Sequence, residues 1–323
     1  MGFIKNKKLS GDVVDAQELT KKFGGEIAVN SLTMRVPRGT IFGFIGPSGC
    51  GKTTTIRMMT GIYRPTSGQL SVLGKNPVNF SKSDQEKIGY LIQQFVLYPE
   101  LTVWENLNFA ASFYGVSLFR YGRLNRLLEF VELKNDKGKL AGALSGGMKR
   151  RLSLAATLVH NPELLFLDEP TAGIDPLLRR KFWDYFKELQ AQGHTLFVTT
   201  QYISEAAYCD LVGIMYEGKL LMVETPEELR RKAYGGDIIG IKTTEWIRHE
   251  NRQKLESLPF VRGKIRVIND QEIEVVVDEA NTAIPALIEA CKAEGVKIET
   301  IEQISPPFDD VFVKLIERES VNV

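Results

Sequence analysis

The residues from Gly46 to Thr53 combine glycines, a lysine and a hydroxyl group in an order that suits phosphate binding. They fit the pattern G-x-x-x-x-G-K-[ST], in which glycines let backbone N–H groups close around an anion at a helix N-terminus. Lys52 would reach the β- and γ-phosphates, and the Thr53 hydroxyl would bind Mg²⁺. We therefore expect the following residues to bind a nucleotide: Gly46, Pro47, Ser48, Gly49, Cys50, Gly51, Lys52, Thr53 and Thr54.

Two adjacent carboxylates end a second apolar segment. Residues 164–167 read Leu-Leu-Phe-Leu, and Asp168 and Glu169 follow them. A buried parallel strand presents side chains at its carboxyl end, where such sheets bind ligands. Asp168 is expected to hold Mg²⁺, and Glu169 to polarise an attacking water as general base. Lys52 would complete this catalytic set.

The elements that must position these residues alternate between strand and helix. Residues 40–45 predict a strand that runs into the glycine-rich loop, and residues 52–61 predict a helix. Apolar residues spaced three and four apart then indicate a helical subdomain at about 95–160. Strand and helix alternate again over 164–209, which is typical of a parallel sheet with helices on its faces. We assign residues 13–234 to this α/β domain.

A second, smaller domain is expected at 237–323, after the sequence Tyr-Gly-Gly-Asp at 234–237. Its predicted order is strand, helix, strand, strand, helix, strand, which is the ferredoxin-like α+β pattern. Residues 1–12 are interpreted as a flexible tail. The net charge of +1 argues against a broad nucleic-acid-binding surface, and no apolar run reaches the length of a membrane span.

Between the phosphate loop and the paired carboxylates stands Leu144-Ser145-Gly146-Gly147-Met148. With this third motif the chain resembles the ATPase subunits of ABC transporters over roughly residues 13–232. The resemblance implies a P-loop ATPase domain that uses ATP and Mg²⁺. It also implies a second ATPase subunit packed head to tail, membrane-spanning permease subunits, and a peripheral place on the cytoplasmic face of the membrane. Ser145, Gly146 and Gly147 would bind the γ-phosphate held by the other subunit.

The resemblance assigns roles to further residues. Phe23 matches the aromatic residue that stacks on adenine. Gln93 matches the glutamine that touches Mg²⁺ and couples to the permease, although Gln94 is adjacent. Asp175 matches the aspartate of the loop that crosses to the second subunit. Gln201 stands where the family usually has a histidine, and we interpret it as a working replacement that hydrogen-bonds the γ-phosphate or the attacking water.

The sequence TTQY at 199–202, together with PPFDDVF at 306–312, resembles the type-2 ABC exporters of drugs, lipids and polysaccharides. Two alternatives stay open. One is a non-transport ABC ATPase, and the other is an importer ATPase whose C-terminal domain binds a regulatory ligand.

Three further features are interpreted mainly as structural: a basic run, a cysteine and a group of aromatic residues. Lys149, Arg150 and Arg151 are expected on a solvated helix face. Cys50 is interpreted as a small loop residue, although a helix N-terminus tends to lower a thiol pKa. The aromatic residues between 95 and 121 are expected to be mostly local core, with a part near 95–105 receiving a helix of the permease: Phe95, Tyr98, Trp104, Phe109, Phe113, Tyr114, Phe119 and Tyr121.

Overall fold

The structure is a computed structural model that describes residues 11–94 and 96–321. The chain divides into two compact units between Val223 and Glu224. This division lies before helix α7 (Pro226–Tyr234), whereas the sequence placed the boundary after it. The reason is that α7 packs against α10 (Phe308–Val321), a helix of the second unit.

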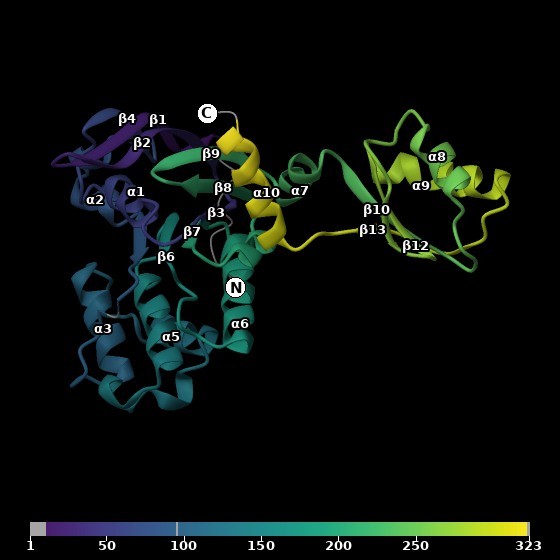
Figure 1. The fold of residues 1–323 in the computed structure, drawn as a ribbon. Helices are drawn as coiled ribbons and strands as arrows, with labels where there is room; N and C mark the ends of the chain where they lie inside the picture. Colours follow the sequence, from purple (N-terminus) through teal and green to yellow (C-terminus); the bar gives the residue numbers. More distant parts are fainter. Residues whose placement is uncertain (1–10, 95, 322–323) are drawn as a thin grey trace. The chain divides into compact units, whose positions relative to one another are not determined.

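A six-stranded sheet forms the centre of the first unit (Figure 1). Neighbouring strands from β5 to β8 run parallel, so the carboxyl ends of β6, β7 and β3 meet at one edge. Each residue of these three strands is buried, as expected for parallel strands covered on both faces. In spatial order the strands are β5 (Ile88–Leu91), β6 (Leu164–Asp168), β7 (Thr195–Thr200), β3 (Ile41–Ile45), β8 (Leu211–Tyr216) and β9 (Lys219–Glu224).

A second, antiparallel sheet covers the phosphate-loop side of this unit. It contains β2 (Glu26–Pro37), β1 (Asp12–Phe23) and β4 (Ser67–Val72), in that order. Apolar residues from both sheets form one core, in which the rings of Phe42 and Phe197 stack at 5.3 Å between centroids. Helix α1 (Lys52–Met59) buries Ile56, Met58 and Met59 in the same core, which anchors the helix that follows the phosphate loop.

Most of the remaining helices of the first unit begin at residues whose side chains cap them. Thr102 and Glu105 form a capping box at α3, Ser145 caps α5, and Asp175 caps α6, which has Pro176 at its first position. Figure 1 shows α3 and α5 grouped at one end of this unit and β1, β2 and β4 at the other. The helices are α2 (Lys82–Gln85), α3 (Val103–Phe113), α4 (Tyr121–Phe130), α5 (Gly146–Thr157) and α6 (Pro176–Ala191), with short 3₁₀ turns at 77–79, 134–136, 141–143 and 203–208.

Most of the aromatic residues expected as local core are in fact exposed. Phe113 and Phe119 keep 71% and 101% of their surface, and Tyr98, Phe109 and Tyr121 are exposed as well. Trp104 and Tyr114 are half-buried, and Phe95 lies outside the described residues. The short helices α3 and α4 bury only one face each, so aromatic residues on the opposite face contact one another but stay exposed.

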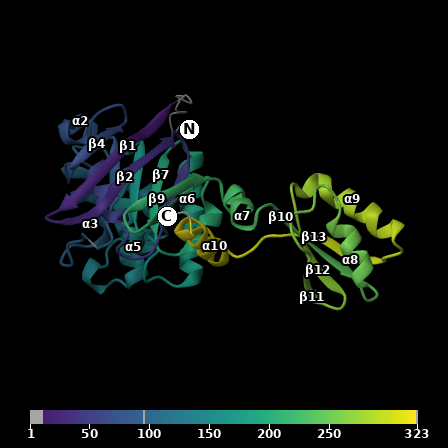
Figure 2. The same ribbon diagram turned by 45° about the horizontal axis from the view of Figure 1, so that its top comes forward.

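The second unit contains a four-stranded antiparallel sheet with α8 and α9 on one face (Figures 1 and 2). The expected β-α-β-β-α-β order is present, and the spatial strand order β11-β12-β10-β13 places the third strand between the first and the second. This is the ferredoxin-like arrangement. Its elements are β10 (Asp237–Thr243), α8 (His249–Glu256), β11 (Arg266–Asn269), β12 (Glu272–Val277), α9 (Ala280–Ala293) and β13 (Ile298–Ile304).

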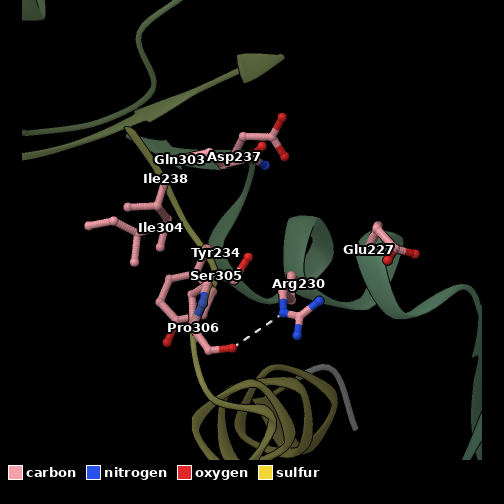
Figure 3. A pocket seen from close by; sticks show the side chains of 10 residues that line it. Glu227, Arg230, Tyr234, Asp237, Ile238, Gln303, Ile304, Ser305 and Pro306 are labelled. Atoms are coloured by element: carbon pink, nitrogen blue, oxygen red, sulfur yellow. Dashed lines mark hydrogen bonds between the residues drawn. The ribbon is translucent and has the colours of Figure 1, made fainter. Parts of the chain in front are cut away.

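Helices α7 and α10 flank this sheet in sequence and contact each other. The Lys314 ammonium lies over the Tyr234 ring at 4.3 Å from the centroid. Figure 3 shows a small pocket beside them, which is lined by Arg230 and Pro306 among others and has a volume of about 50 Å³. The Pro306 carbonyl oxygen accepts a hydrogen bond from Arg230 Nε at 3.3 Å. Pockets for small organic ligands begin at roughly 300 Å³. This pocket therefore gives no support to the alternative of a regulatory ligand.

None of the helices formed by residues 11–94 and 96–321 combines the length and the hydrophobicity needed to cross a bilayer.

Candidate active site

The phosphate loop connects β3 to α1 and follows a path that requires glycine. Gly49 and Gly51 have φ of +80° and +109°, values that L side chains rarely adopt. A Cβ at Gly46 would lie 2.1 Å from the Met215 carbonyl oxygen, and one at Gly51 would lie 2.4 Å from the Ala28 oxygen. The loop is therefore pressed closely against neighbouring backbone. Its turn leaves the N-terminal amides of α1 at the edge where β6 and β7 end.

Lys52 is the buried cation of this loop, with 4% of its surface exposed. Its ammonium donates to the carbonyl oxygens of Gly46 and Pro47, at 2.8 and 2.9 Å. It also lies 3.8 Å from the Glu169 carboxylate. Two carbonyls and one carboxylate thus hold the lysine inside the loop, where phosphate oxygens would be alternative acceptors.

Asp168 joins two threonine hydroxyls from different elements. Its Oδ1 accepts from Thr53 Oγ1 at 3.1 Å and from Thr199 Oγ1 at 2.7 Å, and the carboxylate is almost fully buried. A carboxylate and a hydroxyl in contact form a pair of hard oxygen ligands of the kind that Mg²⁺ prefers. The residues present therefore fit Mg²⁺. Burial, with the Asp168 charge as the second cause, raises the pKa of nearby Tyr90 to about 12.

Glu169 has a left-handed backbone, with φ of +47°. Such a conformation is strained for a residue with a side chain and must be held by its surroundings. Its N–H donates to the carbonyl oxygen and to the hydroxyl of Thr199, each at 3.1 Å. Its side chain is 13% exposed, and Oε2 accepts from Gln93 Nε2 at 3.0 Å. The structure thus brings Lys52, Thr53, Gln93, Asp168 and Glu169 together.

Phe23 ends β1 with a ring that is 45% exposed. The Tyr63 ring meets it edge on at 5.3 Å between centroids, and the Lys21 ammonium lies over Phe23 at 5.0 Å. One face of this aromatic pair is thus occupied by a cation. The exposed part of the Phe23 ring is open to a planar base.

Ser145 and Asp175 belong to a different place in the unit. Ser145 Oγ accepts from Met148 N at 3.2 Å, and Asp175 Oδ1 accepts from Leu178 N at 3.0 Å, so each side chain caps its own helix. A Cβ at Gly147 would lie 2.5 Å from Leu178 Cδ2, which places the starts of α5 and α6 side by side. Figure 1 shows α5 well apart from α1. The Ser-Gly-Gly segment and Asp175 therefore form a second group.

Gln201 follows β7 directly and is exposed. Because β7 lies between β6 and β3, this residue stands at the same sheet edge as Asp168 and Gly46. The next residue, Tyr202, packs under the Arg179 guanidinium at 3.9 Å. His194, at the opposite end of β7, bonds the Pro162 carbonyl through Nδ1 at 2.6 Å and is buried.

Two smaller expectations concern Cys50 and the basic run at 149–151. Burial raises the pKa of the Cys50 thiol, even though Lys52 is close, which is opposite to the lowering that a helix N-terminus alone would produce. The expectation of a solvated basic face is wrong for Arg150, which is only 2% exposed. Its guanidinium binds the backbone of the loops that carry Gln93 and Glu169.

Sequence reasoning missed Thr199 and Arg150 as parts of the site. Helical spacing could have revealed Arg150, because it shares one face of α5 with the buried residues Ser153, Leu154 and Thr157. Thr199 offered no local signal, because its role depends on which strand lies beside β6.

The sequence matches two families of known proteins. The model of the family described as ABC transporter matches residues 29–172, and that of the ATP-binding protein DrrA1-3-like, C-terminal domain matches residues 225–316. The daunorubicin resistance ATP-binding protein DrrA3 of Streptomyces coeruleorubidus is 33% identical over 305 residues, which is 94% of either chain. The chain belongs to the ATP-binding proteins of ABC transporters. The resemblance inferred from the motifs is thereby confirmed.

Other ABC transporter ATP-binding proteins match about 70% of this chain. "Probable multidrug ABC transporter ATP-binding protein YbhF" of Escherichia coli strain K12 is 43% identical over 222 residues, which is 68% of this chain. The matched part is 38% of the length of YbhF. The Nod factor export ATP-binding protein I of Burkholderia lata is 37% identical over 230 residues, or 71% of this chain and 76% of that protein.

Solved structures of ABC cassettes share the fold of this ABC protein. A structure described as the ATP-binding subunit of an ABC transporter has a TM-score of 0.63 at 28% identity, over 69% of this chain and 93% of that one. A dimeric bacterial ABC transporter cassette, MJ0796, has a TM-score of 0.61 at 26% identity, over 66% and 98%. The predicted P-loop ATPase fold is thus confirmed.

Proposed function

We propose that this protein binds Mg·ATP and hydrolyses it to drive export through separate membrane-spanning permease subunits. One observation carries the proposal: Lys52, Thr53, Asp168, Glu169 and Gln93 converge at the carboxyl edge of the parallel sheet. The relatives that share the cassette include proteins named for drug resistance and Nod factor export, which supports the direction of transport.

Each residue of the cluster has a distinct task. The amides of the phosphate loop and the Lys52 ammonium would bind the β- and γ-phosphates. The phosphate oxygens would then accept from Lys52 in place of the Gly46 and Pro47 carbonyl oxygens. Thr53 and Asp168 would hold Mg²⁺, with the Gln93 amide oxygen turned away from Glu169 as a further ligand. When bound, Mg²⁺ would neutralise phosphate charge. Glu169 would orient the attacking water and take its proton, and Gln201 would hydrogen-bond that water or the γ-phosphate.

The second group of site residues supports a second ATPase subunit. Ser145, Gly146, Gly147 and Asp175 stand at helix starts apart from the phosphate loop of the same chain. Two copies packed head to tail would place each Ser-Gly-Gly segment against the nucleotide of the other copy. The amides at the N-terminus of α5 would then donate to the γ-phosphate.

The permease partner would place this subunit at the cytoplasmic face of the membrane. Exposed aromatic side chains on the helical subdomain, such as Phe109 and Phe113, offer an apolar surface for such a partner. The even balance of 41 basic and 40 acidic residues gives no general attraction to nucleic acid.

The decisive experiment removes the proton acceptor while keeping the shape of the site. Glu169→Gln should bind Mg·ATP, lose turnover by roughly 10²- to 10⁴-fold, and form a stable ATP-bound dimer in gel filtration. Glu188→Gln, an exposed change on α6, should behave like the unchanged protein. Absence of Mg·ATP binding, or failure of Glu169→Gln to trap a dimer, would exclude the proposed function.

A further inference from the structure

Arg150 lies on helix α5 and binds four backbone carbonyls of two loops. Its Nε donates to Pro170 O at 2.7 Å, and its Nη1 donates to Ile92 O at 3.1 Å and to Gln93 O at 2.9 Å. Its Nη2 donates to Glu169 O. These contacts join residues that lie 57 and 19 positions away from Arg150 in the chain.

This arrangement requires an arginine. A guanidinium carries five N–H donors in a rigid planar fork, whereas a lysine offers three donors from a single point. With 2% of its surface exposed, the side chain has lost its contact with water, and burial lowers its pKa from the usual value. The charges of Asp168 and Glu169 act in the opposite direction and favour the charged form. A buried charge of this kind is retained only where its hydrogen bonds are satisfied.

The contact to Glu169 acts on a strained residue. The left-handed φ of +47° aims the Glu169 side chain at Gln93 and Lys52. Thr199 holds the N–H side of this residue, and Arg150 holds its carbonyl side. Because both peptide groups are held, the direction of the Cα–Cβ bond is set, and the contacts with Gln93 and Lys52 then hold the carboxylate.

We propose that Arg150 is a positioning residue that fixes the direction of Glu169 and of the Gln93 loop. The inference rests on the proposed function, because it assigns Arg150 a task in the hydrolysis that Glu169 performs. Helix α5 begins at the Ser-Gly-Gly segment, and Arg150 lies within its first two turns. The helix start and the loops of Glu169 and Gln93 therefore move as one body, so that contact of Ser145 with a second subunit's nucleotide is transmitted to the carboxylate of its own chain.

The test compares Arg150→Met and Arg150→Lys with Arg151→Met as the matched control. Arg151 is the next residue of the same helix, and its guanidinium contacts Val131 and Glu132, away from the site. Turnover, the Kd for a non-hydrolysable ATP analogue and the thermal midpoint are measured for each full-length protein. Arg150→Met is expected to lower kcat by roughly 10²-fold with an unchanged Kd, because a small displacement of a catalytic group costs about that much. Arg150→Lys should recover only part of this loss, and Arg151→Met should match the unchanged protein.

A second measurement separates positioning from structural support. The double variant Arg150→Met with Glu169→Gln is expected to form the ATP-bound dimer as well as Glu169→Gln alone, because closure does not require the proton transfer. Loss of that dimer, or loss of nucleotide affinity in both Arg150 variants, would show a structural role and overturn the proposal. Unchanged kcat in a folded Arg150→Lys or Arg150→Met would overturn it as well. Absence of turnover in the unchanged protein would instead reject the proposed function itself.

Discussion

The side-chain amide of Gln93 donates to the carboxylate of Glu169, with 3.0 Å between Nε2 and Oε2, although the two residues are 76 positions apart in the sequence. Gln93 is the second residue after β5, and Glu169 follows β6 directly. Since β5 and β6 are neighbouring parallel strands, their carboxyl ends bring these two side chains to the same edge. The geometry thus favours Gln93 over its neighbour Gln94 as the residue that faces the site.

We predict that Gln93→Ala lowers ATP turnover by about tenfold or more, because Glu169 loses a hydrogen bond that orients it. Gln94→Ala is the matched control and should leave the rate unchanged. Steady-state ATPase assays of both variants measure the difference. The reverse ranking would show that Gln94 is the residue that faces the site.

Thr199 is predicted to tune the affinity for Mg²⁺ through Asp168. Its hydroxyl donates to Asp168 Oδ1 at 2.7 Å, and partners of this kind typically change metal affinity by about 10- to 100-fold when they are removed. Thr199→Val should therefore shift the Mg²⁺ dependence of ATP hydrolysis to higher concentration by such a factor. Thr199→Ser keeps the hydroxyl and should stay close to the unchanged protein. Equal Mg²⁺ dependence of Thr199→Val and Thr199→Ser would contradict the role.

Gln201 is predicted to contribute directly to hydrolysis. The residue follows β7 at the site edge, and its amide can hydrogen-bond the γ-phosphate or the attacking water without carrying charge. Gln201→Ala should lower turnover by roughly 10²-fold, whereas Gln201→His should retain part of the activity and gain a pH dependence near the histidine pKa of about 6.5. Turnover is measured with the permease present. An unchanged rate of ATP turnover in Gln201→Ala would contradict a direct role of Gln201 in hydrolysis.

Glu205 is predicted to make stability depend on pH. The side chain is buried, accepts from Thr171 Oγ1 at 2.7 Å and lies 3.7 Å from Arg179. Burial raises its pKa above the usual 4.5 in spite of this arginine, so the folded protein favours the neutral carboxyl. The neutral Glu205 carboxyl therefore makes its full contribution to the stability of the fold below about pH 4.5. This contribution is lost as the pH rises through the raised pKa of Glu205.

Glu205→Gln cannot ionise and still accepts from Thr171. The free energy of unfolding of the unchanged protein, relative to this variant, should therefore decrease as the pH is raised above about 4.5. Urea titrations at several pH values measure it, and the exposed change Glu188→Gln serves as the control. A difference that stays constant over this range would show that Glu205 does not titrate.

Features that depend on neighbouring residues alone could be predicted from the amino-acid sequence. The phosphate loop occupies eight successive residues whose glycines, lysine and threonine act together, so its chemistry is readable without a fold. The alternation of strand and helix and the ferredoxin-like order were also predictable, because periodicity reports the buried face of each element. These patterns led to the ABC family, which the relatives confirmed.

Contacts between residues that are distant in the sequence depend on the packing of the whole fold. Local spacing does not reveal that β7 lies between β6 and β3, and this order brings Thr199 to Asp168 and Glu169. Composition suggested that Arg150 was solvated, but the packing of α5 against the site loops buried it. Conversely, Phe113 at the end of α3 and Phe119 in the loop before α4 were expected in the core but are exposed, because the core lies on the other side of these elements. Whether a side chain is buried depends on which other elements pack against its own helix, strand or loop. Those elements come from distant parts of the chain, so local sequence patterns do not reveal them.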